Sequence, residues 1–358
     1  MKGSIWAFMM VVFFINSDRI VFQSKPLRSL SLKDTEIRKH ILDDYGEKID
    51  LFAKKDSSGM IYWFRKLKTP VCLSGECKEI SVGIYWYSNG KFLGLEVYNE
   101  ELTKTDHSVF TNEDYNNLIE VLIDDWSVLR EYEYDDLLNE EMEGVDGVTG
   151  ATKKEIADGT VEGAVYTTYT LWHLIHVGEK DQIQSLTAQL LNTNKSLLNV
   201  FLKISNDDYK NFALELMIDG KLDPTESMTS LVFDYLTLKD DIYRRELAFK
   251  SLPYLDLEKP LVQVHLARAF SKLSSMEKMR IVNNLNEDIQ LEDILYRSLV
   301  EELKYLDEWG AAKILNLVKK FQKQDSEVVK LANNLSTSSN NYVRKIAIEF
   351  LESNSSPD

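Results

Sequence analysis

The sequence predicts an α+β domain followed by an all-α domain. The chain has 358 residues, a length that suits two domains with separate cores. Runs rich in β-branched and aromatic residues occur only before Gly178, and 13 of the 15 glycines lie at or before this position. Beyond Gly178, apolar residues recur at helical spacing between short polar turns. We expect an N-terminal segment at 1–17, an α+β domain at 22–178 and a helical domain at 179–358.

The charge balance excludes nucleic acid as a partner class. Lys and Arg number 42 against 58 Asp and Glu, so the net charge is -16. A surface with this balance repels a phosphate backbone instead of neutralising it.

The first 17 residues are typical of a secretory signal peptide or a short N-terminal anchor. Lys2 precedes an apolar run from Ile5 to Ile15, and polar residues follow it. As a helix this run would rise only about 16 Å, too short to span a bilayer. A short buried helix is the alternative. The segment predicts an extracytoplasmic location, periplasmic or membrane-associated.

The two cysteines, Cys72 and Cys77, are separated by four residues that include Gly75. In an oxidising compartment such a pair favours a small-loop disulfide. Two free thiols are the alternative. The spacing is not C-x-x-C and no histidine is near, which argues against a metal site.

The first predicted element of the mature domain is a helix from Lys33 to Tyr45, with Ile37, Ile41 and Leu42 on one face. Strands are predicted after it, and the last two should form an antiparallel hairpin around Ser88-Asn89-Gly90. The predicted strands are Met60 to Val71, Ile80 to Tyr87 and Phe92 to Tyr98.

Thr111 and Asp114 have the spacing of a capping box that starts a helix. Glu131 to Asp146 contains eight acidic residues and no basic one. Such a run is typical of a solvated face or loop, and docking to a basic partner is the alternative. The helix after Thr111 carries apolar residues at helical spacing, namely Tyr115, Leu118, Leu122 and Ile123.

Three unevenly spaced segments of the helical half place a small residue after a branched apolar one, which lets antiparallel helices approach closely. They resemble HEAT-type α-solenoid repeats, and a plain helical bundle is the alternative. The segments are 243–249, 264–270 and 343–350.

The stretch from Asp146 to Thr152 is the most specific motif. Gly147 and Gly150 allow unusual backbone angles, and Thr149 or Thr152 could cap the helix that begins at Lys153. By pattern alone this is a turn that leads into a helix.

The same stretch resembles the flavinylation motif of the FMN-binding domain family, found in flavin-carrying subunits of ion-pumping NADH:quinone and ferredoxin oxidoreductases and in related extracytoplasmic redox proteins. The family pattern is Asp, two variable positions, Ser or Thr, Gly, Ala, then Ser or Thr. The resemblance implies that the last hydroxyl carries FMN through a phosphoester, and that a flavin transferase recognises the rest. The matching residues are Asp146, Thr149, Gly150, Ala151 and Thr152.

Other residues are candidates for the surroundings of the flavin. Tyr169 lies with Tyr166 and Trp172 on one face of a helix predicted from Gly159 to Gly178, where it could pack on the flavin or simply form core. His173 and His176 lack a third ligand, so no metal is predicted. Lys104, Asp106 and His107 form a polar cluster that could lie at the flavin edge or cap a loop.

The sequence therefore predicts an exported flavoprotein with FMN on Thr152 that passes electrons from a membrane-linked donor to an extracytoplasmic acceptor. A flavin transferase and a redox partner protein or membrane electron-transfer complex are the implied partners. The alternative is a non-flavinylated interaction or scaffold protein that works through its helical repeats. A reductase with its own substrate is a third possibility, but no independent catalytic site is evident.

Overall fold

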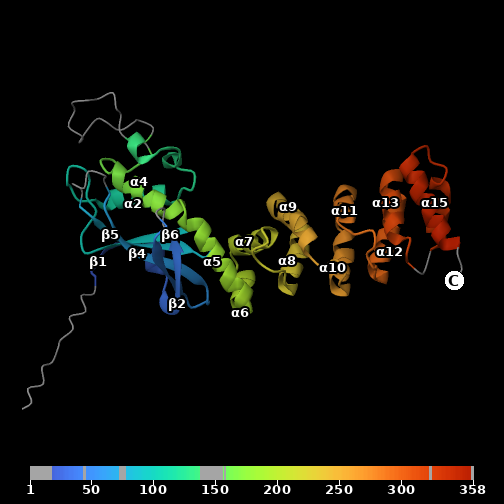
Figure 1. The fold of residues 1–358 in the computed structure, drawn as a ribbon, viewed down its shortest axis with the longest axis horizontal. Helices are drawn as coiled ribbons and strands as arrows, with labels where there is room; N and C mark the ends of the chain where they lie inside the picture. Colours follow the sequence, from blue (N-terminus) through green and yellow to red (C-terminus); the bar gives the residue numbers. More distant parts are fainter. Residues whose placement is uncertain are drawn as a thin grey trace, which may run out of the picture. The chain divides into compact units, whose positions relative to one another are not determined.

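The chain forms two compact units, Met1–Thr187 and Ala188–Asp358 (Figure 1). The computed structural model describes residues 18–42, 46–71, 78–137, 156, 159–321 and 325–355. A six-stranded antiparallel sheet with helices comes first, and helices alone follow. This order confirms the predicted α+β and then all-α organisation.

The sheet has the strand order β1-β6-β5-β4-β3-β2. The three strands predicted between Met60 and Tyr98 are confirmed, and β5 and β6 form the predicted hairpin. Gly90 closes the turn with φ +80°, a conformation that glycine adopts without steric cost. The strands are β1 (Ile20–Gln23), β2 (Lys33–Leu42), β3 (Lys48–Lys55), β4 (Ile61–Thr69), β5 (Ile80–Tyr87) and β6 (Phe92–Tyr98).

The helix predicted from Lys33 to Tyr45 is wrong, because residues 33–42 form the edge strand β2. Ile37 and Ile41 are four residues apart, a spacing that suits both one helix face and one strand face. Burial alternates strictly along β2, and Ile41 pairs with Ile49 of β3. Pairing with β3 therefore decides the conformation of a segment whose own pattern is ambiguous.

Helices cover one face of the sheet (Figure 1). Two fully buried tryptophans lie on that face, and each indole N–H donates to a helix. Trp63 Nε1 donates to Thr187 Oγ1 of α5 (Glu179–Thr193) at 2.9 Å. Trp86 Nε1 donates to the carbonyl of Ile175 in α4 (Val165–His176) at 3.2 Å. These bonds fix both helices against the strands.

The helix α2 (Asn112–Ile123) begins with the predicted capping box of Thr111 and Asp114. Tyr115, Leu118 and Leu122 are buried, whereas Ile123, the last residue of the helix, is 56% exposed.

The helical unit is built from pairs of helices with a regular repeat. The residues that cap the second helix of four pairs are Asp241, Ser274, Asp307 and Asn340, so consecutive caps are 33 residues apart. Matching positions inside these helices are fully buried in every pair: Ala248, Ile281, Ile314 and Ala347.

The pairs are α6 with α7, α8 with α9, α10 with α11, α12 with α13, and α14 with α15. No strand occurs beyond Gly178 among the residues described there, as predicted. The helices are α6 (Lys195–Lys203), α7 (Asp207–Ile218), α8 (Glu226–Leu236), α9 (Ile242–Ser251), α10 (Pro260–Phe270), α11 (Ser275–Val282), α12 (Asp293–Glu302), α13 (Glu308–Val318), α14 (Ser326–Leu335) and α15 (Asn341–Ser355).

Among the described residues, no helix combines the length and the apolar character needed to cross a membrane. Residues 1–17, which carry the predicted signal peptide, lie outside the described part of the chain.

We predict that the bond between Trp63 and Thr187 couples the sheet to α5. A double-mutant cycle with Trp63→Phe and Thr187→Val should give a coupling free energy of about 1 kcal/mol, because each single change leaves one buried polar group unpaired. Urea unfolding of the four proteins measures it.

Trp126→Phe is the control, because Trp126 is 81% exposed and its replacement should change the free energy of unfolding by less than about 0.5 kcal/mol. Strict additivity of Trp63→Phe and Thr187→Val would contradict the prediction.

Candidate functional site

The motif residues Asp146, Thr149, Gly150, Ala151 and Thr152 lie outside the described residues, as do Cys72 and Cys77. The structure does define the chain on both sides of the motif. Residues up to Leu137 precede it, and Ile156 and the residues from Gly159 follow it. The candidate site is therefore built from these two flanks and from the side chains that hold them.

The flank before the motif consists of two short 3-10 helices, η1 (Val128–Glu131) and η2 (Tyr134–Leu137). Leu129 and Leu137 are fully buried and fasten both turns to the core. The Tyr134 hydroxyl donates to the carbonyl of Val71 at 2.9 Å, and its ring stacks on Tyr166 at 5.2 Å between centroids. The acidic run thus starts from an anchored segment, although Glu131, Glu133 and Asp136 are exposed.

The aromatic and histidine face of α4 holds this flank. Tyr169 is buried, and its hydroxyl donates to the carbonyl of Tyr132 at 2.9 Å. Burial, with the nearby charges of Glu133 and Asp136, raises its pKa to about 12. Trp172 Nε1 donates to the carbonyl of Asp124 at 2.9 Å. The predicted stripe is therefore part of the core.

The two histidines of α4 also contact backbone carbonyls. His173 Nε2 lies 3.2 Å from the carbonyl oxygen of Leu129, and His176 Nε2 lies 3.0 Å from that of Leu122. Desolvation lowers the pKa of His176, although Asp125 stands 3.3 Å from its Nδ1. Among the described residues, no group of His, Cys, Asp and Glu could hold a metal ion.

The flank after the motif is fastened by short-range bonds. Ile156 is fully buried, and its carbonyl accepts from Thr160 Oγ1 at 3.0 Å. The backbone N–H of Val161 donates to Thr168 Oγ1 of α4 at 3.3 Å. Gly163, with φ +72°, turns the chain into α4, so this helix starts at Val165 instead of at the predicted Gly159.

Of the three predicted polar residues, Lys104 supports the turn at Gly163, and its neighbour Thr105 bonds to it. The carbonyl of Gly163 accepts from both the backbone N–H and the hydroxyl of Thr105, at 2.7 and 2.8 Å. The Lys104 stem packs against Gly163, and its Nζ lies 2.8 Å from a carboxylate oxygen of Asp114. Asp106 accepts from the backbone N–H and hydroxyl of Ser108 in the same loop.

His107 is exposed and adopts φ +63°. The structure therefore brings Lys104 and Tyr169 to the two flanks of the motif, one on each side, while His107 occupies the loop tip. Asp106 caps its own loop, whereas Lys104 contacts Gly163 and pairs with Asp114 of α2.

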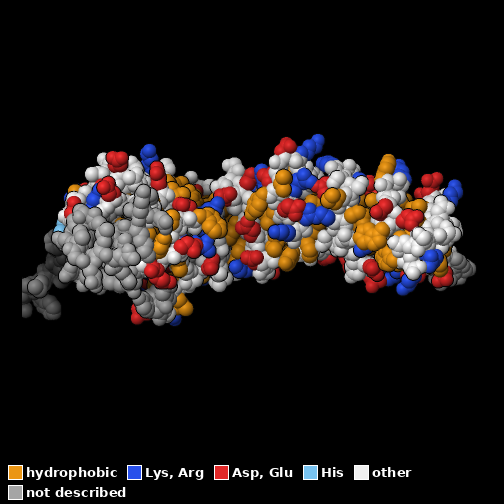
Figure 2. Space-filling model, turned by 90° about the horizontal axis from the view of Figure 1, so that it is seen from above, with side chains coloured by type: hydrophobic (Ala, Val, Ile, Leu, Met, Phe, Trp, Pro, Cys, Tyr) orange, Lys and Arg blue, Asp and Glu red, His pale blue; other side chains and the backbone are white. Residues whose placement is uncertain are grey.

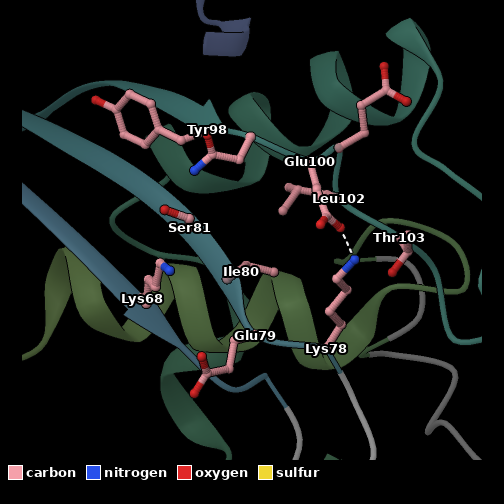
Figure 3. A pocket seen from close by; sticks show the side chains of 11 residues that line it. Lys68, Lys78, Glu79, Ile80, Ser81, Tyr98, Glu100, Leu102 and Thr103 are labelled. Atoms are coloured by element: carbon pink, nitrogen blue, oxygen red, sulfur yellow. Dashed lines mark hydrogen bonds and ion pairs between the residues drawn. The ribbon is translucent and has the colours of Figure 1, made fainter. Parts of the chain in front are cut away.

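Beside this region is a pocket of about 310 Å³ that the sequence did not reveal (Figure 3). It opens between the ends of β4, β5 and β6, and Lys78 pairs with Glu100 across it. The Ser81 Oγ is buried and has no hydrogen-bond partner among the described residues. The lining comes from strand ends separated in sequence, which explains why no local motif marks it.

A second feature missed in the sequence is a buried carboxylate on the face of the sheet opposite Trp63 and Trp86. Glu96 is 6% exposed and accepts from the hydroxyls of Tyr85 and Tyr98 and from the Gln23 side chain, at 2.8, 2.5 and 2.8 Å. Burial and the Glu96 charge raise the pKa values of both tyrosines. The alternation of side chains along β5 and β6 would have predicted that these residues share one face of the sheet. It would not have predicted the three hydrogen bonds to Glu96.

Comparison of the chain with protein-family models, with curated proteins and with solved structures found no match. The function is therefore inferred from the motif and the geometry around it.

We predict that the ion pair of Lys104 and Asp114 stabilises unit 1 at neutral pH. Desolvation opposes ionisation of Asp114, but hydrogen bonds from Lys104 and Thr111 outweigh it and lower the pKa below 3.8. This contribution is present above the unfolded pKa and is lost as pH falls through the folded pKa. In Asp114→Asn the free energy of unfolding should fall by about 1–3 kcal/mol at pH 7.

Urea unfolding between about pH 7 and pH 3 tests this, and the decline in stability on acidification should be shallower for Asp114→Asn than for the wild type. Glu113→Gln, an exposed change in the same helical turn, should follow the wild-type profile. A profile for Asp114→Asn parallel to that of the wild type would contradict the assignment.

Proposed function

We propose that the chain is an exported flavoprotein that carries FMN on Thr152 through a phosphoester and passes electrons from a membrane-linked donor to an extracytoplasmic acceptor. The observation that carries this proposal is the complete motif from Asp146 to Thr152. Within the proposal, unit 1 is an FMN-binding domain and a flavin transferase attaches the cofactor outside the cytoplasm.

The flanks of the motif support this proposal. Residues up to Leu137 and from Ile156 are fastened to the same helix, α4, through Tyr134, Tyr166 and Thr168. A modified segment that starts and ends on one rigid helix keeps its cofactor near the domain surface. Such tethering also gives a high effective concentration where a free flavin would be lost by dilution.

The residues around the flanks are compatible with a flavin phosphate. The first turn of α4 holds no acidic residue, and its N-cap Ala164 makes no side-chain cap, so its backbone N–H groups and dipole favour an anion. Lys153 and Lys154 supply positive charge on the side of the motif that leads to α4, and Lys104, which is paired with Asp114, lies on the same side. When bound, the flavin would supply the electron-transfer chemistry, and the protein would supply attachment and orientation.

We further propose that unit 2 is a HEAT-type solenoid that docks a redox partner protein or a membrane electron-transfer complex. The regular 33-residue pairing of helices supports a solenoid over a plain bundle. A second candidate function, a non-flavinylated scaffold, rests on the same repeats and on their exposed apolar residues. Modification of Thr152 distinguishes the two.

We predict that the full chain becomes covalently flavinylated when it is expressed with its N-terminal segment and a flavin transferase. The denatured protein should fluoresce as a flavin in a gel, and its mass should rise by that of FMN minus water. Thr152→Ala should abolish both signals, because it removes the hydroxyl that forms the ester.

Thr160→Ala is the matched control, since the Thr160 hydroxyl is already bonded to the carbonyl of Ile156. It should remain flavinylated. An unmodified wild type would leave the scaffold function as the better account, whereas a flavinylated Thr152→Ala would refute the attachment site alone.

A further inference from the structure

One edge of unit 2 exposes a large apolar side chain in four of the five helix pairs. The second residues of α9, α11, α13 and α15 are Tyr243, Met276, Trp309 and Tyr342, again 33 residues apart. Their exposed fractions are 57, 79, 44 and 40%. Scattered exposed apolar residues are common, but a row at one repeat position marks an interaction surface.

The loops before these helices add unpaired positive charge. Lys239 and Lys272 are exposed, also lie 33 residues apart, and form no ion pair with any described carboxylate. In the next loop, Lys304 stands 4.8 Å from the ring centre of Tyr305, which is 67% exposed. We call the residues 237–245, 271–277 and 303–309 the loop edge.

Three of the five acidic side chains of the loop edge cap a helix or pair with an arginine. Asp241 accepts from the backbone N–H and the Nε of Arg244, and Asp307 accepts from the backbone N–H of Gly310. Glu277 caps α11 and pairs with Arg245. Each loop joins the C-terminus of one helix to the N-terminus of the next, so the two helix dipoles oppose each other there. Side-chain charge therefore sets the local potential. Over the whole loop edge five cations balance five acids, so the excess of positive charge is confined to the recess between the first two loops.

Between two of these loops is a recess of about 590 Å³. Three cations, Lys239, Arg245 and Lys272, line it together with the single acid Glu277, and leucines form its apolar wall. The Arg245 Nε is buried and donates to no acceptor among the described residues. The recess thus offers positive charge and an unused donor in a chain whose net charge is -16.

We propose that the loop edge binds an acidic partner segment that also carries apolar side chains. A carboxylate of the partner occupies the recess beside Lys239, Arg245 and Lys272, and apolar side chains of the partner pack on Tyr243 and Met276. The repeat spacing of charge and apolar surface suits an extended polypeptide that crosses successive loops.

A protein segment fits this edge better than an anionic membrane does, because a flat bilayer cannot fill a recess between two loops. Apolar, cationic and acidic side chains are interspersed on the face of unit 2 shown in Figure 2. The proposal holds for a flavoprotein and for a scaffold alike, since it uses no residue of unit 1.

A random-peptide display library selected on the full chain tests the proposal. The enriched peptides should contain Asp or Glu together with aromatic or aliphatic residues. Synthetic copies should bind in fluorescence anisotropy more weakly as salt is added. The double variant Lys239→Ser, Lys272→Ser should weaken binding by at least about fivefold, and so should Tyr243→Ser, Met276→Ser.

Lys203→Ser, Lys250→Ser is the matched control, with two exposed lysines of the same unit removed away from the recess. It should bind as the wild type does. Enrichment of basic or uncharged peptides, no enrichment, or equal binding by all variants would overturn the proposal. Binding to phosphatidylglycerol vesicles without selection of acidic peptides would identify a membrane surface instead. Circular dichroism of each variant checks that the fold is retained.

Discussion

Unit 1 depends on the burial of one face of its sheet beneath α4 and α5. Trp63 and Trp86 lie fully buried on that face, and a buried indole N–H needs an acceptor. Their acceptors, Thr187 and the carbonyl of Ile175, belong to the two helices. The tryptophans therefore set the position of α4, and through α4 they set the flanks of the motif.

A fixed α4 explains why its polar residues have structural partners. Tyr169, His173 and His176 all contact backbone carbonyls between Leu122 and Tyr132. All three residues hold the segment that leads to the motif. Contact of Tyr169 with a flavin stays a prediction.

Unit 2 separates its constraints by position within each repeat. Ala248, Ile281, Ile314 and Ala347 are fully buried, so packing restricts their size. The second residue of the same helices is free of that restriction, and polar side chains would be well solvated there. Large apolar residues at this position are explained by a partner more readily than by folding. The buried positions of the repeat thus fix the spacing of the helices, and in our proposal the exposed positions bind the partner segment.

Local sequence determined the elements whose signals are local. The hairpin around Gly90 follows from turn chemistry, the start of α2 from the spacing of Thr111 and Asp114, and the helical half from apolar periodicity. The motif from Asp146 to Thr152 could also be recognised from the sequence alone, and the described structure adds only its anchored flanks.

Tertiary structure decided the features that depend on residues far apart in the sequence. Residues 33–42 form the strand β2 because β3 pairs with them. The 33-residue repeat of unit 2 is defined by the positions of the helix caps, which depend on where each helix begins in the fold. The cluster around Glu96 and the recess beside Arg245 join residues from separate strands and loops, and such contacts have no local sequence pattern.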